Sequence, residues 1–245
     1  MTAHVDEDAL RHAELDTLRP RFPLSGRVLE VGAGSGLQAA TITSWGLDVA
    51  AVDLPARDRV ATHHTVVEYD GVRLPFAPGT FDVVFSSNVL EHVRDLPSLL
   101  DETRRVLAPN GFALHVLPTP TWRVATSLTH PLTALRKLAR GQREVAVGGH
   151  ADATTSRRPM TLLRRGLFSG PHGEFPSATA EIRGFSSHRW TARFSEAGWK
   201  LQDRFALGVF YTGETIWPSL SIAWRRRLAV VFGAATAAYV VRPGR

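Results

Sequence analysis

The sequence contains no cysteine, which excludes disulfide scaffolds, zinc ribbons, iron–sulfur clusters and cysteine nucleophiles. Lysine is almost absent too, because only Lys137 and Lys200 occur and every other basic residue is arginine. Arginine suits the recognition of phosphate and carboxylate groups, although a GC-rich genome would produce the same bias without any function. Cysteine chemistry is therefore excluded, and the reason for the arginine content stays open.

Long apolar runs are also scarce. The longest, Leu228–Val241, spans 14 residues, whereas a membrane-spanning helix needs about 18 or more. The N-terminal stretch Met1–Arg19 is mixed in charge, spaces its leucines like one helix face, and lacks the apolar h-region of a signal peptide. We therefore expect a soluble, cytoplasmic protein.

The 245 residues suit one domain with room for a sizeable insertion, and an apolar fraction of 44% is too high for a disordered chain. The net charge of +6 is the sum of an acidic first half and a basic second half. Residues 1–120 carry 10 basic and 16 acidic side chains, whereas residues 121–245 carry 19 basic and 7 acidic ones. The basic half favours an anionic partner, such as a phosphorylated substrate, an anionic lipid or a nucleic acid.

Strand and helix patterns alternate over the first 120 residues. This alternation implies a parallel sheet with right-handed crossovers, and so a doubly wound α/β fold. The predicted strands are Arg27–Val31, Leu47–Val52, Thr65–Glu68, Phe81–Ser86 and Phe112–Leu117, and the predicted helices are Leu37–Trp45 and a helix capped by Asp95 that runs to Leu107.

The regular pattern ends at Pro118. Residues 118–185 contain several prolines and arginine pairs, and so long a departure after the fifth strand predicts an inserted cap or lid. The pattern recovers from Ser187. The elements expected in this half are short helices at Thr133–Arg140 and Thr161–Phe168, a helix through Trp190, Phe194 and Ala197, and a strand at Lys200–Phe210.

The most specific signal is the glycine-rich loop Gly32–Gly36, between the first strand and the first helix. Glycines let the backbone turn tightly and let a ligand approach without Cβ collisions. The nicotinamide-dinucleotide fingerprint requires its third glycine at position 37, which is Leu37 here. Glu30, two residues upstream of the loop, is awkward beside a pyrophosphate but natural beside a cationic ligand.

Further motifs follow this loop in a characteristic order: Asp53 at the end of the second strand, Asp70 before Leu74-Pro75-Phe76, then Phe81-Asp82-Val83-Val84, Asn88-Val89-Leu90-Glu91-His92-Val93 and Pro109-Asn110-Gly111-Phe112. In this order and spacing, residues 26–117 resemble class I S-adenosylmethionine-dependent methyltransferases of the small-molecule type. The resemblance implies a Rossmann-like, mostly parallel seven-stranded sheet with an insertion after strand five, and S-adenosylmethionine as the cofactor.

The resemblance also implies roles for individual residues. For two of them a structural alternative remains, namely that Asp53 caps the following turn and that Asp70 forms an Asx turn before Gly71. Gly32, Gly34 and Gly36 would surround the methionine part of the cofactor, with Glu30 nearby. Asp53 would contact the ribose, with Leu54 beside it, and Asp70 and Gly71 would contact the adenine. Asn88 would lie near the sulfonium methyl group.

A hydroxyl acceptor benefits from a base whose pKa lies near the working pH. His92, just after the fourth strand, is the first candidate for this catalytic base, and a structural histidine at a helix start is the alternative. His150, His172 and His188 follow as candidates that would enter from a lid. No metal site is predicted, because His63-His64 has no nearby third ligand.

We therefore expect methyl transfer to oxygen, less readily to nitrogen, of a small-molecule or lipid/glycan-linked acceptor. Nucleic acid is disfavoured, because Ser87-Asn88-Val89-Leu90 stands where base-modifying relatives carry an Asn/Asp-Pro-Pro-aromatic tetrad. The alternatives are a non-catalytic cofactor-binding or membrane-surface protein and an RNA methyltransferase. The oligomeric state is not predicted.

The C-terminal region allows two interpretations. Arg225–Arg227, next to Trp224 and the apolar run, would suit peripheral contact with an anionic membrane at the inner membrane surface. Alternatively, the arginines form a solvated bend and Ala237–Val241 is the buried last strand of the sheet. The predicted regions are an N-terminal helix in residues 1–25, a cofactor-binding core in 26–120, a lid over the acceptor site in 121–186, and a sheet-completing segment with a basic tail in 187–245.

Overall fold

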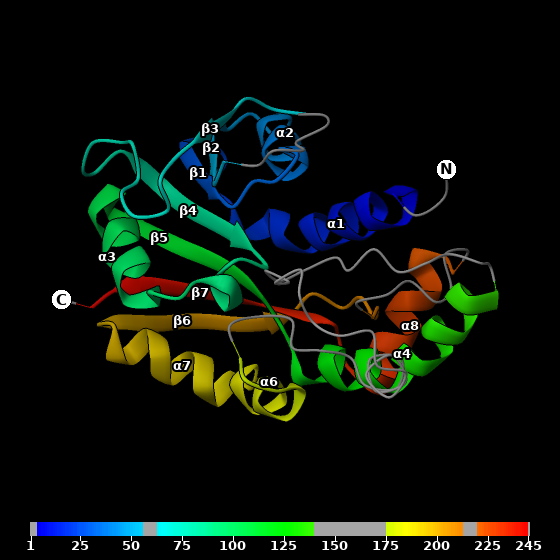
Figure 1. Ribbon diagram of the computed structural model, residues 1–245. Helices are drawn as coiled ribbons and strands as arrows, with labels where there is room; N and C mark the ends of the chain where they lie inside the picture. The colour runs from blue at the N-terminus through cyan, green and yellow to red at the C-terminus, as the bar shows by residue number, and fades with distance from the viewer. Residues whose placement is uncertain (1–3, 56–62, 140–174, 213–219, 245) are drawn as a thin grey trace.

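Seven strands hydrogen-bond side by side in the order β3-β2-β1-β4-β5-β7-β6 (Figure 1). Neighbouring strands from β3 to β5 run parallel, whereas β7 runs antiparallel to both β5 and β6. The predicted doubly wound, mostly parallel Rossmann-like sheet is therefore confirmed. The strands are β1 (Arg27–Val31), β2 (Asp48–Asp53), β3 (Val66–Glu68), β4 (Phe81–Ser87), β5 (Leu107–Pro118), β6 (Trp199–Ala206) and β7 (Thr236–Pro243).

The structure is a computed structural model that describes residues 4–55, 63–139, 175–212 and 220–244. Helices α3 and α7 cover one face of the sheet, whereas α1 and α2 cover the other. The helices are α1 (His4–Leu18), α2 (Leu37–Thr43), α3 (Leu96–Val106), α4 (Pro120–Ala139), α6 (Ala178–Gly184), α7 (Ser187–Glu196) and α8 (Ile222–Phe232), with 3₁₀ turns η1 (Arg19–Arg21) and η2 (Leu90–His92).

Alternation along β1 assigns its side chains to the two faces. Leu29 and Val31 pack with α3 and α7, whereas Val28 packs with α1 and α2. Both faces of the strand are buried, which explains why its sequence is a short continuous apolar run rather than an alternating one. Glu30 is the exception in that run, and it is buried as well.

The prediction that regular structure stops at Pro118 is wrong for the next twenty residues, which form the single helix α4. Pro120 is compatible with this helix because it occupies the first turn, where a backbone donor is not needed. Trp122 and Arg123 are buried and anchor the helix. Of the short helix expected at Thr133–Arg140, residues 133–139 are the end of α4, while Arg140 and the helix expected at Thr161–Phe168 lie outside the described residues.

The expectation that Arg225–Arg227 forms a bend is also wrong, because these arginines lie within α8. Ser221 caps this helix by accepting a hydrogen bond from the Trp224 amide, and Arg225 is buried with its Nε donating to the Leu220 carbonyl. The expected final strand is confirmed as β7, whose core residues are buried between β5 and β6.

Two strand boundaries differ from the predicted ones by more than two residues. β5 begins at Leu107 rather than Phe112, because the pairing with β4 shifts register between Phe81 and Val83. β6 ends at Ala206 rather than Phe210. Within the described residues, no helix is both long enough and apolar enough to cross a membrane.

Candidate functional site

The carboxyl ends of β1, β2 and β4 lie next to one another in the sheet. The chain leaves β1 toward β2 on one side, and β4 pairs with β1 on the other, so the strand order reverses here. Ligands of doubly wound sheets bind in the crevice at such a point. The residues that follow these three strand ends therefore form the candidate site.

The glycine loop after β1 is held against the end of β2 by backbone hydrogen bonds. The amides of Gly32 and Ala33 both donate to the Val52 carbonyl, at 2.9 and 3.1 Å. One residue further along β2, the Asp53 carboxylate accepts from the Gly34 amide at 2.6 Å and from the Leu54 amide at 2.7 Å. The carboxylate of Asp53 thus orders both the loop and the turn after β2, which is the capping role left open by the sequence.

Two glycines of the loop need glycine for different reasons. Gly32 has φ of 76°, and an added Cβ would lie 2.3 Å from Cγ2 of Val89, so only glycine allows the loop to pack on the segment after β4. Gly34 has φ of 55°, and an added Cβ would meet no heavy atom of the described residues within 4 Å. Among those residues, the backbone at Gly34 is therefore open, whereas the backbone at Gly32 is packed.

Glu30 is a buried carboxylate below this loop, with 1% of its surface exposed. Neither carboxylate oxygen makes a full hydrogen bond within the described residues. Burial raises the pKa of Glu30 to about 8, and the nearby Asp53 adds to the rise, while the backbone amide of Ala39 opposes it. A buried carboxylate without a partner is costly, so a cationic group at this point would stabilise it.

The turn after β3 adds further polar groups to the same edge. Asp70 is exposed, and its carboxylate accepts from the amides of Val72 and Arg73, which hold its pKa below the ordinary value. This is the Asx-type turn that the sequence left as an alternative. An added Cβ on Gly71 would lie 2.8 Å from Cδ2 of Leu54, so the turns after β2 and β3 touch.

Tyr69 was not anticipated as a site residue. Burial raises the pKa of its phenol, and the neighbouring carboxylates of Asp53 and Asp70 raise it further. The phenol therefore lies close to both acids at this edge. Its position at the end of a three-residue strand carries no sequence signal that distinguishes it from a core aromatic.

Asn88 follows β4 in a left-handed conformation, with φ of 54°. Its amide donates to the Val116 carbonyl of β5 at 2.9 Å, and its side-chain amide donates to the Ser87 hydroxyl at 3.4 Å. Asparagine tolerates positive φ better than most residues do. The turn at Asn88 directs the chain across the glycine loop, where Val89 contacts Gly32.

Glu91 and His92 lie in η2, immediately beyond that turn. The carboxylate of Glu91 is buried, whereas His92 is exposed, and His92 Nε2 lies 3.9 Å from Glu91 Oε1. Burial raises the pKa of Glu91 to about 8; Arg11 lowers it and Glu181 raises it. The sequence singled out His92 but missed Glu91, since nothing in the pattern indicates that this glutamate points inward.

A buried ion pair lies next to Glu91. Arg123 Nε of α4 is 2.6 Å from Glu181 Oε2 of α6, and both side chains are almost fully buried. On the other side, the buried Glu14 of α1 accepts from the Tyr211 hydroxyl at 2.9 Å and pairs with Arg11. Charged groups from three helices therefore converge under η2, which sequence spacing does not reveal.

The remaining histidines are dispersed. The His63 amide donates to the Ser35 carbonyl, so this segment lies along the glycine loop. His115 is buried in β5 with Nδ1 2.8 Å from the Ser86 hydroxyl, and burial lowers its pKa to about 3. His188 is exposed on α7, while His150 and His172 lie outside the described residues. Among the described residues, no group of three or more His, Asp or Glu is placed to hold a metal ion.

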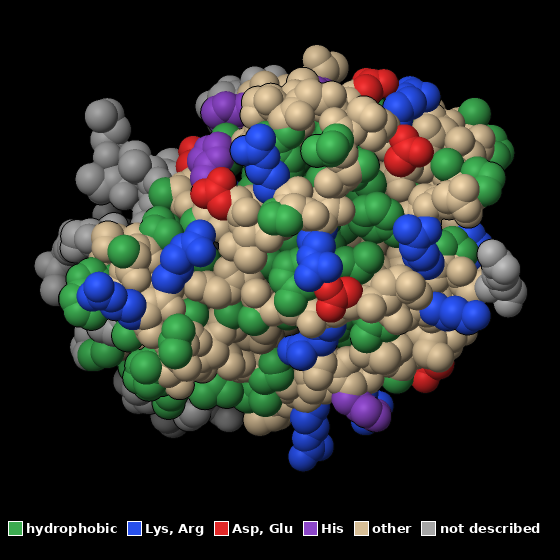
Figure 2. Space-filling model, turned by 180° about the vertical axis from the view of Figure 1, so that it is seen from behind, with side chains coloured by type: hydrophobic (Ala, Val, Ile, Leu, Met, Phe, Trp, Pro, Cys, Tyr) green, Lys and Arg blue, Asp and Glu red, His purple; other side chains and the backbone are tan. Residues whose placement is uncertain are grey.

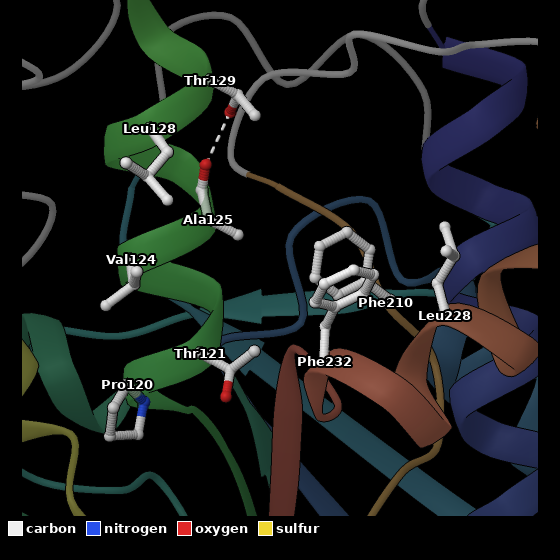
Figure 3. Close-up of a pocket in the computed structure, with 9 residues that line it drawn as sticks. All are labelled: Pro120, Thr121, Val124, Ala125, Leu128, Thr129, Phe210, Leu228 and Phe232. Carbon is white, nitrogen blue, oxygen red and sulfur yellow. Dashed lines mark hydrogen bonds between the residues drawn. The ribbon is translucent and has the colours of Figure 1, made fainter.

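A cavity of about 540 Å³ opens between α4 and α8, beyond the carboxyl end of β5 (Figure 3). The rings of Phe210 and Phe232, whose centres lie 5.8 Å apart, line the cavity on the side opposite α4. The lining residues are Pro120, Thr121, Val124, Ala125, Leu128, Thr129, Phe210, Leu228 and Phe232.

The sheet order and the glycine loop together define the fold of the S-adenosylmethionine-dependent methyltransferases. Solved members from Aquifex aeolicus and Mesorhizobium loti share it with TM-scores of 0.53 each, at 13% and 18% sequence identity. The first comparison covers 96% of this chain and 93% of that one, and the second covers 94% and 97%. S-adenosylmethionine is the cofactor of this class of enzymes.

The family model of a methyltransferase domain matches residues 2–202, and this chain belongs to that family. An uncharacterized methyltransferase of Mycobacterium sp. (strain KMS) is 36% identical over 153 residues, or 58% of this chain and 60% of the relative. A ubiquinone biosynthesis O-methyltransferase of Xylella fastidiosa (strain 9a5c) is 34% identical over 116 residues, or 42% of this chain and 46% of the relative. The chain thus spans about 60% or less of the length of these two relatives.

Proposed function

We propose that this protein transfers a methyl group from S-adenosylmethionine to an oxygen, less readily to a nitrogen, of a small-molecule or lipid/glycan-linked acceptor. The observation that carries the proposal is the buried carboxylate of Glu30, whose oxygens make no full hydrogen bond within the described residues. It lies below a glycine loop in which an added Cβ at Gly34 would meet none of the described atoms within 4 Å. A cationic ligand of extended shape would satisfy both features. S-adenosylmethionine supplies a methyl group already activated by a positively charged sulfur.

Along this edge of the sheet, successive groups of residues would contact successive parts of the cofactor. Glu30 would hold the amino group, with Gly32, Gly34 and Gly36 around the methionine part. Asp53 would accept hydrogen bonds from the ribose hydroxyls, exchanging its bond to the Gly34 amide for them.

At the adjoining turn, Leu54 would cover the adenine from one side, since it already lies against Gly71. Asp70 would accept from the adenine amino group with its carboxylate, and the Gly71 backbone would lie beside the ring. Asn88, at the end of β4, would border the place where the methyl group leaves. Positioning the acceptor there supplies most of the rate enhancement available to such a reaction.

His92 is the proposed acceptor of the hydroxyl proton. Its ring is partly exposed, and its Nε2 lies 3.9 Å from Oε1 of the buried Glu91 side chain. Support for oxygen as the acceptor atom comes from the relatives named ubiquinone biosynthesis O-methyltransferases.

Calorimetry with S-adenosylmethionine and its demethylated product tests the proposal directly. Gly34→Arg fills the open space and should abolish binding of both ligands. Gly79→Arg is a matched control, because Gly79 also has positive φ with no heavy atom within 4 Å of an added Cβ, but lies in the turn before β4. Absence of binding by the wild-type protein, or unchanged binding by Gly34→Arg, would overturn the cofactor assignment.

A further inference from the structure

The cavity between α4 and α8 has walls that suit hydrocarbon. Seven of its nine lining residues are apolar, and the polar ones are Thr121 and Thr129. The Thr129 hydroxyl already donates to the Ala125 carbonyl at 2.7 Å. A polar ligand group placed in this cavity would lose its water with little compensation. The volume of about 540 Å³ is in the range of ordinary ligand sites.

The cavity lies at the same edge of the sheet as the glycine loop, where the parallel strands have their carboxyl ends. Helix α4 begins directly after β5, and Thr119 between them is held by hydrogen bonds to the carbonyls of Ala234 and Ala235. The end of β5 is in turn bonded to Asn88 through the Val116 carbonyl. The cavity therefore opens beyond the strand ends that border the proposed methyl-transfer site.

Large apolar side chains are exposed beside the cavity. Leu128 of α4 and Val230, Val231 and Phe232 of α8, here called the α4–α8 ridge, are between 60% and 88% exposed. Figure 2 shows hydrophobic side chains gathered at the end of the molecule that carries these helices, with Lys and Arg side chains nearby. Several large apolar side chains exposed beside one cavity indicate an interaction site.

Exposed arginines lie beside the ridge. Helix α8 contains three arginines and no acidic residue, and Arg225 is the buried one of the three. Arg226 and Arg227 are exposed, and the Arg227 guanidinium lies 4.7 Å from the centre of the Trp224 ring. Apolar side chains, an indole and exposed arginines on one helix are complementary to an anionic lipid surface.

We infer that the cavity binds the hydrocarbon chain of an amphipathic acceptor, and that the α4–α8 ridge contacts the anionic lipid surface in which this acceptor resides. The inference rests on the proposed function and narrows its acceptor to the lipid class. The arginines attract the surface, the ridge enters its apolar layer, and the cavity receives a chain that need not cross water.

Chain binding is tested by calorimetry with dodecyl maltoside below its micelle concentration, which presents a chain without charge. Ala125→Leu narrows the cavity and should weaken binding on the order of tenfold. Ala223→Leu makes the same change on the exposed side of α8, outside the cavity lining, and should leave binding unchanged. The affinity for S-adenosylmethionine should be equal in all three proteins.

Surface binding is tested by flotation with phosphatidylcholine vesicles, with and without about 30 mol% phosphatidylglycerol. The wild-type protein should float with the anionic vesicles only, and less as the salt concentration rises. Val230→Asp with Val231→Asp, and separately Arg227→Glu, should each abolish flotation. Neither substitution touches the cofactor residues, so binding of S-adenosylmethionine serves as the folding control.

The inference is overturned if S-adenosylmethionine binds but dodecyl maltoside does not, or if Ala125→Leu binds the detergent as the wild type does. It is also overturned if sedimentation shows a dimer that the Val230→Asp, Val231→Asp variant loses while vesicles are never bound, because the ridge then contacts a second copy of this chain. Failure of the wild-type protein to bind S-adenosylmethionine would instead refute the proposed function.

Discussion

The buried carboxylate of Glu30 links the sequence of this protein to its chemistry. Within the described residues its oxygens have no full hydrogen bond, and burial raises its pKa to about 8. Such a group is costly to keep in a core strand, and evolution rarely retains one without a ligand to compensate it. A cation bound there would favour the ionised form and lower this pKa.

Cofactor binding should therefore release a proton from Glu30. Because its pKa is about 8 without ligand and lower with it, the affinity for S-adenosylmethionine should rise with pH between 6 and 7.5, by up to about tenfold per pH unit. Glu30→Gln should bind more weakly and lose most of this pH dependence. Calorimetry in buffers of different ionisation enthalpy measures the proton release, and the exposed Glu68→Gln is the control.

His92 should matter for turnover rather than for cofactor binding. If its ring accepts the acceptor's proton, His92→Ala should lower kcat by about 10²–10⁴-fold and leave the affinity for S-adenosylmethionine nearly unchanged. The exposed His188→Ala on α7 should change neither quantity. A parallel loss of turnover and affinity in His92→Ala would indicate a structural histidine instead.

Glu91 makes stability depend on pH. Its folded pKa of about 8 lies above the ordinary value of 4.5, so the folded state binds one more proton than the unfolded state between these values. The free energy of unfolding therefore falls as pH rises from about 4.5 to 8, and each pKa unit corresponds to about 1.4 kcal/mol.

Glu91→Gln removes this titration, so its free energy of unfolding should change less than the wild type's between pH 5.5 and 8. Urea unfolding at both pH values measures the difference, and Glu68→Gln should behave like the wild type. Equal pH dependence in Glu91→Gln would show that the carboxylate is not buried in solution.

The junction of β1 and α2 depends on close contact with the segment after β4. An added Cβ on Gly32 would meet the Val89 side chain at 2.3 Å, in a backbone conformation with φ of 76°. Gly32→Ala should therefore destabilise the protein by about 1–3 kcal/mol, from backbone strain and the clash together.

A double-mutant cycle separates the two contributions. In a Val89→Ala background the clash is removed and the strain remains, so Gly32→Ala should cost less there than in the wild type. Urea unfolding of the four proteins gives the coupling free energy. Strict additivity would mean that the contact between the two loops is absent in solution.

Elements differ in how well their sequences predicted them. β1, β2 and β4 are buried on both faces between Gly- and Pro-containing turns, so short apolar runs located them within a residue or two. Helix α4 was missed because Pro120 and Pro131 suggested breaks, and α8 was missed because Arg225–Arg227 suggested solvent. In both cases tertiary packing overrides the local signal: Trp122 and Arg123 anchor α4, and Arg225 is buried within α8.

The uneven charge of the chain corresponds to a division of surfaces. The acidic first half contains Glu30, Asp53 and Asp70, which converge at the sheet edge where a cation is proposed to bind. The basic second half supplies α4 and α8, which flank the apolar cavity. Acidic residues thus lie where the cationic cofactor is proposed to bind. Basic residues lie where the acceptor at an anionic surface is proposed to bind.

Ligand binding should stabilise the folded chain. At a concentration of S-adenosylmethionine 100 times its Kd, the free energy of unfolding should rise by about 2.7 kcal/mol. For a protein of this length that corresponds to a rise in Tm of about 5 °C or more. Asp53→Ala should lose most of this shift because it removes the proposed ribose contact, whereas Asp48→Ala, at the exposed start of β2, should keep it. A full shift in Asp53→Ala would refute the ribose assignment.

The sequence by itself determined which chemistry is excluded and where the candidate site lies. The lack of cysteine excluded whole classes of chemistry at once, and the order of the glycine loop, Asp53, Asp70 and Asn88 located the candidate site, because strand ends of a parallel sheet meet at one edge. The first inference needs only composition, whereas the second rests on the resemblance of these motifs, in their order and spacing, to the methyltransferase family.

The convergence of Glu91, Arg123 and Glu181, and the cavity between α4 and α8, were not predictable in this way. Their residues come from distant segments, and whether a charged side chain points inward depends on which helix packs over it. Motifs that resemble those of the methyltransferase family therefore indicated the cofactor edge, whereas helix packing created the cavity and the basic, apolar surface beside it.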